Sequence, residues 1–212
     1  MTASKPHSGK RSQILRAATD VFSVREFHTV PVDDVATAAG VGKGTLYLYF
    51  PTKEQLFYAT ILEALDVLLA ELATTTRGRR GEDALRAFTR GLVGFFWRRR
   101  HLAVLMHRYE HKQREPEGEA WRLRRLRLVT MARNALQPEA RTAGLSTTDT
   151  VLAAEMLLAM IRAAILNQRE RDEPERSVTL VVDFFLNGLR GPRAGAVRQP
   201  TRPRRAAAGA RR

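Results

Sequence analysis

The sequence has 212 residues, of which 44% are hydrophobic and 27% are charged, so its composition is that of an ordinary folded protein. It contains no cysteine, which excludes disulfide frameworks, thiolate metal sites and cysteine nucleophiles. The formal net charge of +14 points to a polyanionic partner, either nucleic acid or an anionic membrane surface.

Most of this charge lies at the two ends of the chain. Residues 1–11 carry two lysines and one arginine without an acid, and residues 190–212 carry eight arginines without an acid. Only +3 of the +14 is left for the residues between them. Residues 191–212 consist of arginine, alanine, glycine, proline, valine, glutamine and threonine alone, which cannot build a core. We therefore predict disordered basic tails at 1–9 and 191–212.

Between the tails, apolar residues recur at helical spacing and no segment alternates like a β-strand. The pattern predicts helices at 12–22, 32–39, 44–50, 52–73, 83–98, 101–114, 118–136, 147–171 and 175–189. The N-terminus is polar, and the most apolar stretch, 151–166, is interrupted by Glu155 and Arg162. We expect an all-α cytoplasmic protein with neither a signal peptide nor a membrane span.

The segment 31–50 has the pattern of a helix-turn-helix. Its first helix follows Pro31, whose fixed φ suits a helix start, and Gly40 is expected to end it in the left-handed conformation. In the second helix, Leu46 and Phe50 are expected to face inward. The outer face then carries Gly44, Tyr47 and Leu48, groups that suit the major groove of DNA.

The stretch 35–56, VATAAGVGKGTLYLYFPTKEQL, resembles the signature of the tetracycline-repressor (TetR) family. Ile14, Ala17, Ala18 and Phe22 precede it at a family-like distance, so the resemblance covers roughly residues 10–60. It implies an N-terminal three-helix DNA-binding domain at 10–56 and a C-terminal helical ligand-binding and dimerisation domain at 57–190. It also implies a transcriptional regulator, in practice a repressor, that is not an enzyme and needs no cofactor.

The resemblance implies base contacts for the start of the second helix of the motif. Lys43 stands where the family reads bases, and a lysine there donates to guanine O6 and N7. Thr45 and Tyr47 are expected to touch base edges or the nearby backbone, beside the exposed Gly44. Leu48 either meets a thymine methyl group or packs against the following helix, and the sequence leaves both open.

The resemblance implies phosphate contacts for Tyr49 and Lys53, which would position the protein on DNA without reading its sequence. Asp33 has two interpretations: it accepts a hydrogen bond from cytosine N4, or it stabilises a helix N-terminus together with Asp34.

Two positions depart from the family pattern. Glu26 replaces the usual glycine at the end of the first helix, and Val30-Pro31 replaces a threonine pair at the start of the second. A phosphate-binding hydroxyl is lost there unless Thr29 replaces it.

The family binds palindromic double-stranded DNA as a twofold dimer, which implies a homodimer through 147–189. The apolar residues expected in that interface are Val151, Leu158, Ile161, Ile165, Val178, Val181, Val182, Phe185 and Leu189, although the same residues could simply complete the core of one subunit.

The family also implies a pocket for a small-molecule inducer among the middle helices. Its predicted walls are aromatic residues and methionines: Phe95, Phe96, Trp97, Met106, Tyr109, Trp121, Met131 and Met156. Within this region Glu110 or Glu155 suits a cationic ligand, and Arg90 or Arg162 suits an anionic one.

Other patterns are weaker. Residues 40–45 resemble a P-loop, but glycine and hydroxyl positions fail and no strand precedes them. His107 and His111 have a metal-binding spacing but lack a third ligand. The arginines at 122–127 alternate with leucines and are interpreted as a solvated face. The rival function is a sequence-indifferent DNA-coating protein that binds through its basic tails.

Overall fold

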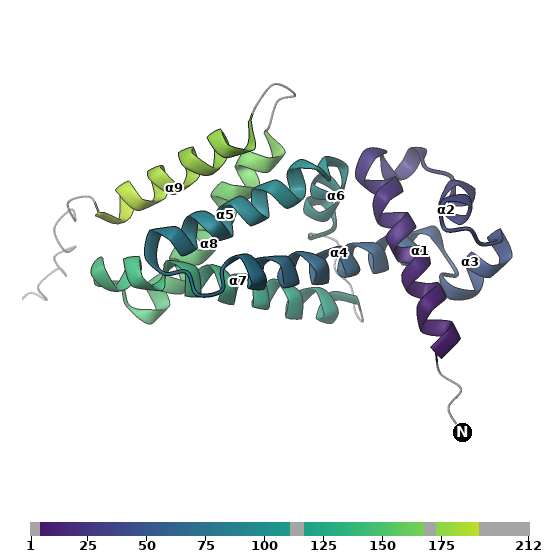
Figure 1. Ribbon diagram of the computed structural model, residues 1–212, viewed down its shortest axis with the longest axis horizontal. Helices are drawn as coiled ribbons and strands as arrows, with labels where there is room; N and C mark the ends of the chain where they lie inside the picture. The colour runs from purple at the N-terminus through teal and green to yellow at the C-terminus, as the bar shows by residue number, and fades with distance from the viewer. Residues whose placement is uncertain (1–4, 111–116, 168–172, 191–212) are drawn as a thin grey trace, which may run out of the picture.

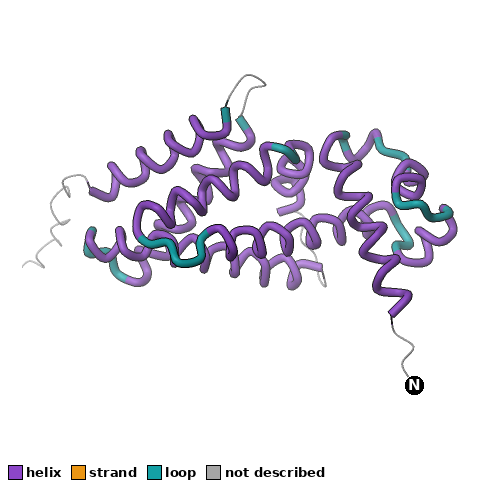
Figure 2. Tube along the Cα trace, viewed as in Figure 1, coloured by secondary structure: helices purple, strands orange, loops and turns teal. Residues whose placement is uncertain are grey.

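The computed structural model describes residues 5–110, 117–167 and 173–190, and these form helices and short connections without any strand. Figure 1 shows an elongated molecule with a small group of helices at one end and a larger bundle at the other. Figure 2 shows the described chain as helix joined by short loops. The all-α prediction is confirmed.

The helices divide into a head, a linking helix and a body. The head comprises α1 (Lys5–Val24), the 3-10 helix η1 (Phe27–Thr29), α2 (Val32–Ala38) and α3 (Lys43–Tyr49). The linking helix is α4 (Lys53–Thr75), and the body comprises α5 (Gly81–Trp97), α6 (Arg100–Glu110), α7 (Glu117–Thr142), α8 (Thr147–Leu166) and α9 (Pro174–Arg190). α4 runs from the head into the body (Figure 1).

Several predicted boundaries are wrong; for example, the helix expected at 147–171 ends at Leu166. Residues 5–9 were expected in a disordered tail, but they begin α1, whose first turn tolerates the missing N–H of Pro6. The rest of both predicted tails, 1–4 and 191–212, lies outside the described residues. α7 continues past Pro138 to Thr142, because a proline removes one hydrogen bond and the buried Ala140 still holds the last turn in the core.

The turn between α2 and α3 depends on Gly40. Its φ is 61°, in the left-handed region, as the sequence predicted. The N–H of Val41 donates to the carbonyl of Ala36 at 3.0 Å and the N–H of Gly40 to that of Thr37 at 3.0 Å, which is a Schellman motif. The Gln13 side chain adds a hydrogen bond of 2.7 Å to the carbonyl of Ala39, so α1 holds the end of α2.

One continuous hydrophobic core extends through head, linking helix and body. In the head, the ring of Phe57 from α4 packs edge-on against Phe22 of α1, with centroids 5.3 Å apart, and against Phe27 at 4.6 Å. Further along α4, Leu65 and Leu68 are buried in the body. The predicted division at 56/57 therefore lies within an unbroken helix, and it stays a prediction.

None of the helices in the described parts of the chain is long and apolar enough to cross a bilayer.

Replacing Gly40 with alanine tests the turn. The methyl group would make only an ordinary contact, 3.9 Å from Gln13 Nε2, so the cost is that of the left-handed backbone. We expect Gly40→Ala to lower the free energy of unfolding by about 1–2 kcal/mol in urea denaturation. Gly94→Ala is the control, because Gly94 lies inside α5 with open space around it and should gain stability. Equal effects at the two positions would contradict this account.

Candidate nucleic-acid interface and internal cavity

α3 presents one face to solvent and buries the other. Leu48 is 84% exposed and Tyr47 is 39% exposed, whereas Leu46, which faces the core, is 1% exposed. Lys43 and Gly44 are exposed at the start of the helix. The exposure of Leu48 rules out the interpretation that it packs against α4.

The inner face of α3 is anchored by two residues. Leu46 and Phe50 are buried with Val35 of α2 in the core of the head. On its other side the ring of Phe50 is covered by the guanidinium of Arg11, 5.3 Å from the ring centroid. Because both anchors are fixed, the outward direction of Tyr47 is fixed as well.

Two aspartates occupy the first turn of α2, and each pairs with a basic side chain. Asp33 accepts a hydrogen bond from Lys43 Nζ at 2.9 Å, and this hydrogen bond raises the pKa of Lys43 above its ordinary value. Asp34 forms an ion pair with Arg25. Lys43 and Asp33 therefore lie on the solvent side of the head as one exposed pair that joins α2 to α3.

Tyr49 and Lys53 are less exposed than the residues at the start of α3. Lys53 begins α4, and its Nζ lies 4.5 Å from the centroid of the Phe27 ring. Partial burial lowers the pKa of Lys53 below its ordinary value. The hydroxyl of Thr52 caps α4 by accepting from the N–H of Gln55 at 3.1 Å.

The departures from the family pattern are accommodated within η1 and α2. The hydroxyl of Thr29 donates to the carbonyl of Glu26 at 2.9 Å. Pro31 is the N-cap of α2 rather than its first helical residue, and no side chain caps this helix. That Thr29 replaces the missing threonine pair at a phosphate stays a prediction.

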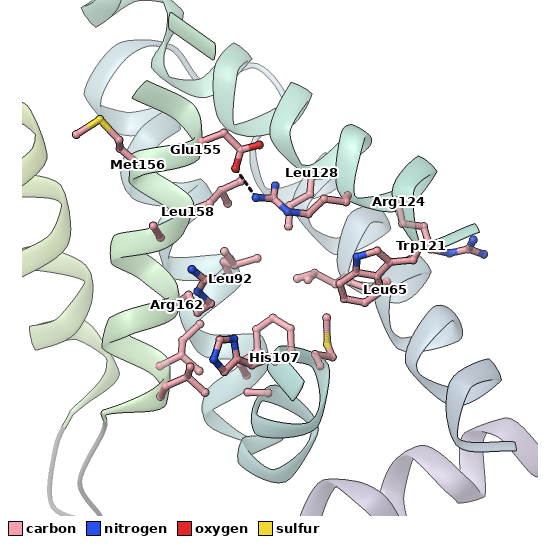
Figure 3. A pocket seen from close by; sticks show the side chains of 18 residues that line it. Leu65, Leu92, His107, Trp121, Arg124, Leu128, Glu155, Met156, Leu158 and Arg162 are labelled. Carbon is pink, nitrogen blue, oxygen red and sulfur yellow. Dashed lines mark hydrogen bonds and ion pairs between the residues drawn. The ribbon is translucent and has the colours of Figure 1, made fainter. Parts of the chain in front are cut away.

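The body contains a cavity of about 420 Å³ between α4, α5, α6, α7 and α8, which is partly open to solvent (Figure 3). Most of its lining is apolar: Leu65, Leu68, Leu92, Phe96, Ala103, Met106, Trp121, Leu128, Met156, Leu158, Ala159, Ile165 and Leu166. Five further residues carry charged or polar groups: His107, Arg124, Arg125, Glu155 and Arg162.

Half of the predicted wall residues line this cavity. Phe96, Met106, Trp121 and Met156 belong to the lining, whereas Phe95, Trp97 and Met131 do not. Successive residues of a helix point about 100° apart, so Phe96 excludes its neighbours on α5 from the same wall. The ring of Phe95 lies instead under the guanidinium of Arg99, 4.1 Å from its centroid. The side chain of Tyr109 lies outside the described residues.

The interpretation of 122–127 as a solvated face is wrong for two of its arginines. Arg124 Nη2 pairs with Asp66 of α4 at 2.5 Å, and Arg125 pairs with Glu155 of α8. Both arginines belong to the cavity wall. The signal was present in the sequence, because Trp121, Arg124, Arg125 and Leu128 follow the i, i+3, i+4, i+7 spacing of one helix face.

Only some of the charged residues predicted to contact a ligand line the cavity. Glu155 and Arg162 line the cavity, whereas Arg90 lies on the surface and pairs with Glu175 at 2.5 Å. The side chains of Glu110 and His111 lie outside the described residues. Among the described residues no group of three potential metal ligands comes together.

Comparison with known proteins identifies the head. The family model described as "Bacterial regulatory proteins, tetR family" matches residues 14–60, which span α1 to the start of α4. The transcriptional regulator RutR of Escherichia coli is 44% identical over 69 residues, which is 32% of this chain and 32% of RutR. Residues 14–60 therefore carry the sequence of the TetR family.

The whole fold is shared with solved TetR-family structures. A TetR-like transcriptional regulator from Rhodococcus superposes with a TM-score of 0.64 at 26% identity, covering 89% of this chain and all of the other. FadR of Bacillus subtilis, solved in complex with stearoyl-CoA, gives a TM-score of 0.69 at 17% identity, covering 84% of this chain and 98% of FadR. At that identity the likeness to FadR shows the fold alone. The match to curated relatives such as RutR spans only about a third of their length.

The last two helices carry exposed apolar side chains, but these residues differ from those predicted. Seven predicted interface residues are buried in the subunit's own core: Leu158, Ile161, Ile165, Val178, Val181, Val182 and Phe185. The exposed apolar side chains are Leu152 and Met156 on α8, and Leu180 and Phe184 on α9. Of the predicted residues, Val151 is exposed beside them, and Leu189 is partly buried.

Replacing Gly44 with alanine separates stability from DNA contact. The added methyl group meets nothing within 4 Å inside the protein, so the free energy of unfolding should rise by about 0.5–1 kcal/mol. If DNA approaches this face, the same methyl group weakens its binding about tenfold. Fluorescence anisotropy on a selected DNA site measures the affinity, and Gly94→Ala serves as the control that gains stability without losing DNA. Unchanged affinity in Gly44→Ala would show that DNA does not approach Gly44.

Proposed function

We propose that this protein is a ligand-responsive transcriptional repressor that binds a palindromic operator as a homodimer and leaves it when a small molecule fills the cavity. The observation that carries the proposal is the exposed face of α3, fixed by the buried Leu46 and Phe50, in a chain of the TetR family.

In this proposal the start of α3 reads bases. Lys43 donates to guanine in the major groove, and Thr45 and Tyr47 contact base edges or the adjacent backbone. Leu48, with its side chain almost fully in solvent, meets a thymine methyl group. Tyr49 and Lys53 contact phosphates next to the N-terminus of α4, whose dipole favours an anion.

Asp33 reaches DNA as part of its pair with Lys43. A lone carboxylate on this surface would repel phosphate, but the neighbouring ammonium offsets its charge. The pair then presents a donor and an acceptor side by side, which suits a G·C base pair, since guanine accepts and cytosine N4 donates in the major groove.

A twofold dimer through α8 and α9 supplies the symmetry that a palindrome needs. Phe184 is 70% exposed and Leu180 is 67% exposed, and such large apolar groups lose contact with water when a second copy covers them. Leu152 and Met156 extend the same apolar character along α8. Dimerisation through 147–189 is thus proposed with a different set of residues from that expected from the sequence.

The cavity is connected to the head by two packed routes. Leu65 and Leu68 of the cavity wall belong to α4, which begins under the head, and α6 packs against α1. A ligand that favours one arrangement of α4 and α6 therefore changes the position of the head. Two heads must match half-sites about 34 Å apart, so a small displacement is sufficient to lower operator affinity. The stearoyl-CoA complex of FadR shows that a protein of this fold binds a small molecule.

The reading role of α3 is tested by a double variant, Lys43→Ala with Tyr47→Ala. DNA sites selected from a random library should bind the wild-type chain in preference to random duplex. The double variant should lose this preference while keeping weak, salt-sensitive binding, because base contacts specify and backbone contacts do not. Electrophoretic mobility shifts with competitor DNA measure the ratio.

Deletion of residues 191–212 is the companion experiment and tests the DNA-coating rival. The shortened chain should keep its preference for the selected site and lose part of its nonspecific affinity, since the deleted arginines add charge without sequence choice. If the deletion removes all binding and the double variant removes none, the coating function is correct.

Phe184→Asp tests the dimer. A charged side chain in an apolar interface is costly, so the variant should sediment as a monomer where the wild-type chain sediments as a dimer. Val67→Asp is the matched control, because Val67 is an exposed apolar residue of α4, outside the α8–α9 surface. Analytical ultracentrifugation measures both, and a dimeric Phe184→Asp variant would contradict the proposed interface.

A further inference from the structure

The chemistry of the cavity wall deepens the proposed function and rests on its assumption that the cavity is the ligand site. We propose that the cavity takes an apolar monocarboxylate, whose carboxylate group is held by Arg162 of α8 together with His107 of α6.

The apolar part of such a ligand matches most of the wall. The leucines of α4 and α5, with Phe96, Met106 and Trp121, surround the space, and its volume of about 420 Å³ falls in the range of small-molecule sites. A chain or ring system placed here leaves water and contacts buried side chains on several helices. The main share of the binding energy is therefore apolar.

The charged residues of the cavity lining indicate the charge of the ligand's headgroup. The lining holds three arginines, Arg124, Arg125 and Arg162, against one carboxylate, Glu155. Asp66 behind the wall pairs with Arg124, and Glu155 pairs with Arg125. The lining is thus net positive, which favours an anion and disfavours a cation, since a further positive charge in such a space is repelled.

The position of Arg162 indicates where the anion binds. Arg162 follows Glu155 by seven residues, two turns along the same face of α8, which places the two about 10 Å apart along the helix. Figure 3 shows Arg162 and His107 toward one end of the cavity and Glu155 toward the other. Glu155 forms an ion pair with Arg125. Arg162 and His107 therefore lie together at the end of the cavity that is away from the Arg125–Glu155 pair, where a carboxylate can meet both.

The chemistry of the two side chains fits a carboxylate. Arg162 is exposed at the edge of the cavity. An arginine guanidinium donates two parallel N–H groups to the two carboxylate oxygens, and such charge-assisted pairs are stronger than hydrogen bonds between neutral groups. An imidazole N–H of His107 can donate to the same group. Because α6 packs against α1 of the head, a carboxylate held between α6 and α8 bears on the position of the head.

The test is a headgroup series measured by isothermal titration calorimetry on the full chain without DNA. Octanoate, decanoate and dodecanoate are compared with decanol and decylamine, which share the apolar chain but carry a neutral or a cationic head. At least one carboxylate should bind the wild-type chain, and bind about tenfold or more tightly than decanol and decylamine. Failure of all three carboxylates, or equal binding of decanol or decylamine, overturns the proposal.

Two variants locate the headgroup. Arg162→Gln should weaken the carboxylate about tenfold or more and leave decanol binding unchanged. Arg127→Gln is the matched control, because Arg127 is an exposed arginine of α7 outside the lining, and it should change neither. Equal carboxylate binding in both variants overturns the role of Arg162.

The ligand experiments and the DNA-binding experiments can fail independently of each other. If the chain binds carboxylates but shows no preference among DNA sequences, the proposed regulator function is wrong and the proposed ligand class is correct. If the chain binds DNA sequence-specifically but binds no carboxylate, the proposed ligand class is wrong and the DNA-binding part of the proposed function is correct.

Discussion

The whole arrangement depends on the burial of Leu46 and Phe50 beneath α3. A helix of seven residues is too short to persist alone in water, so its existence and its orientation both come from these two anchors and their contact with Val35. The Gly40 turn brings α3 back across α2, and Arg11 covers the exposed side of Phe50. Because the inner face packs in the core, the outer face of α3 stays in contact with solvent and exposes Tyr47 and Leu48.

α4 links the packing of the head to the packing of the body. Its first turns complete the core of the head through Phe57, and its later turns supply Leu65 and Leu68 to the cavity wall. Protein interiors are close-packed, so a helix shared by two cores cannot move in one without repacking in the other. The ion pair between Asp66 and Arg124 ties the same helix to α7. In the proposed function, occupancy of the cavity changes the direction of α3 through this shared helix and through the contact of α6 with α1.

The sequence predicted the helix-turn-helix closely because its determinants are local. Pro31, Gly40 and the spacing of Val35, Leu46 and Phe50 act within a few residues of the structure that they specify. The cavity and the exposed surface of α8 and α9 were predicted poorly, because they depend on which neighbour each helix face meets. Apolar residues such as Ile161 and Phe185 look equally suited to a core or an interface until the packing of α5 against α9 is known.

The buried apolar stripe of α9 explains why this helix exposes Phe184, because Val182 and Phe185 of the same helix lie in the core. Arg86 of α5 pairs with Asp183 at 2.6 Å, and Arg90 pairs with Glu175, whose pKa falls below its ordinary value because it accepts hydrogen bonds from that arginine. Exposed pairs of this kind add little stability, so the rotation of the helix follows from its buried residues. These ion pairs also neutralise positive charges within the body. The net charge of +14 belongs mainly to the chain ends, so the proposed function assigns nonspecific attraction to DNA and the choice of sequence by α3 to separate parts of the molecule.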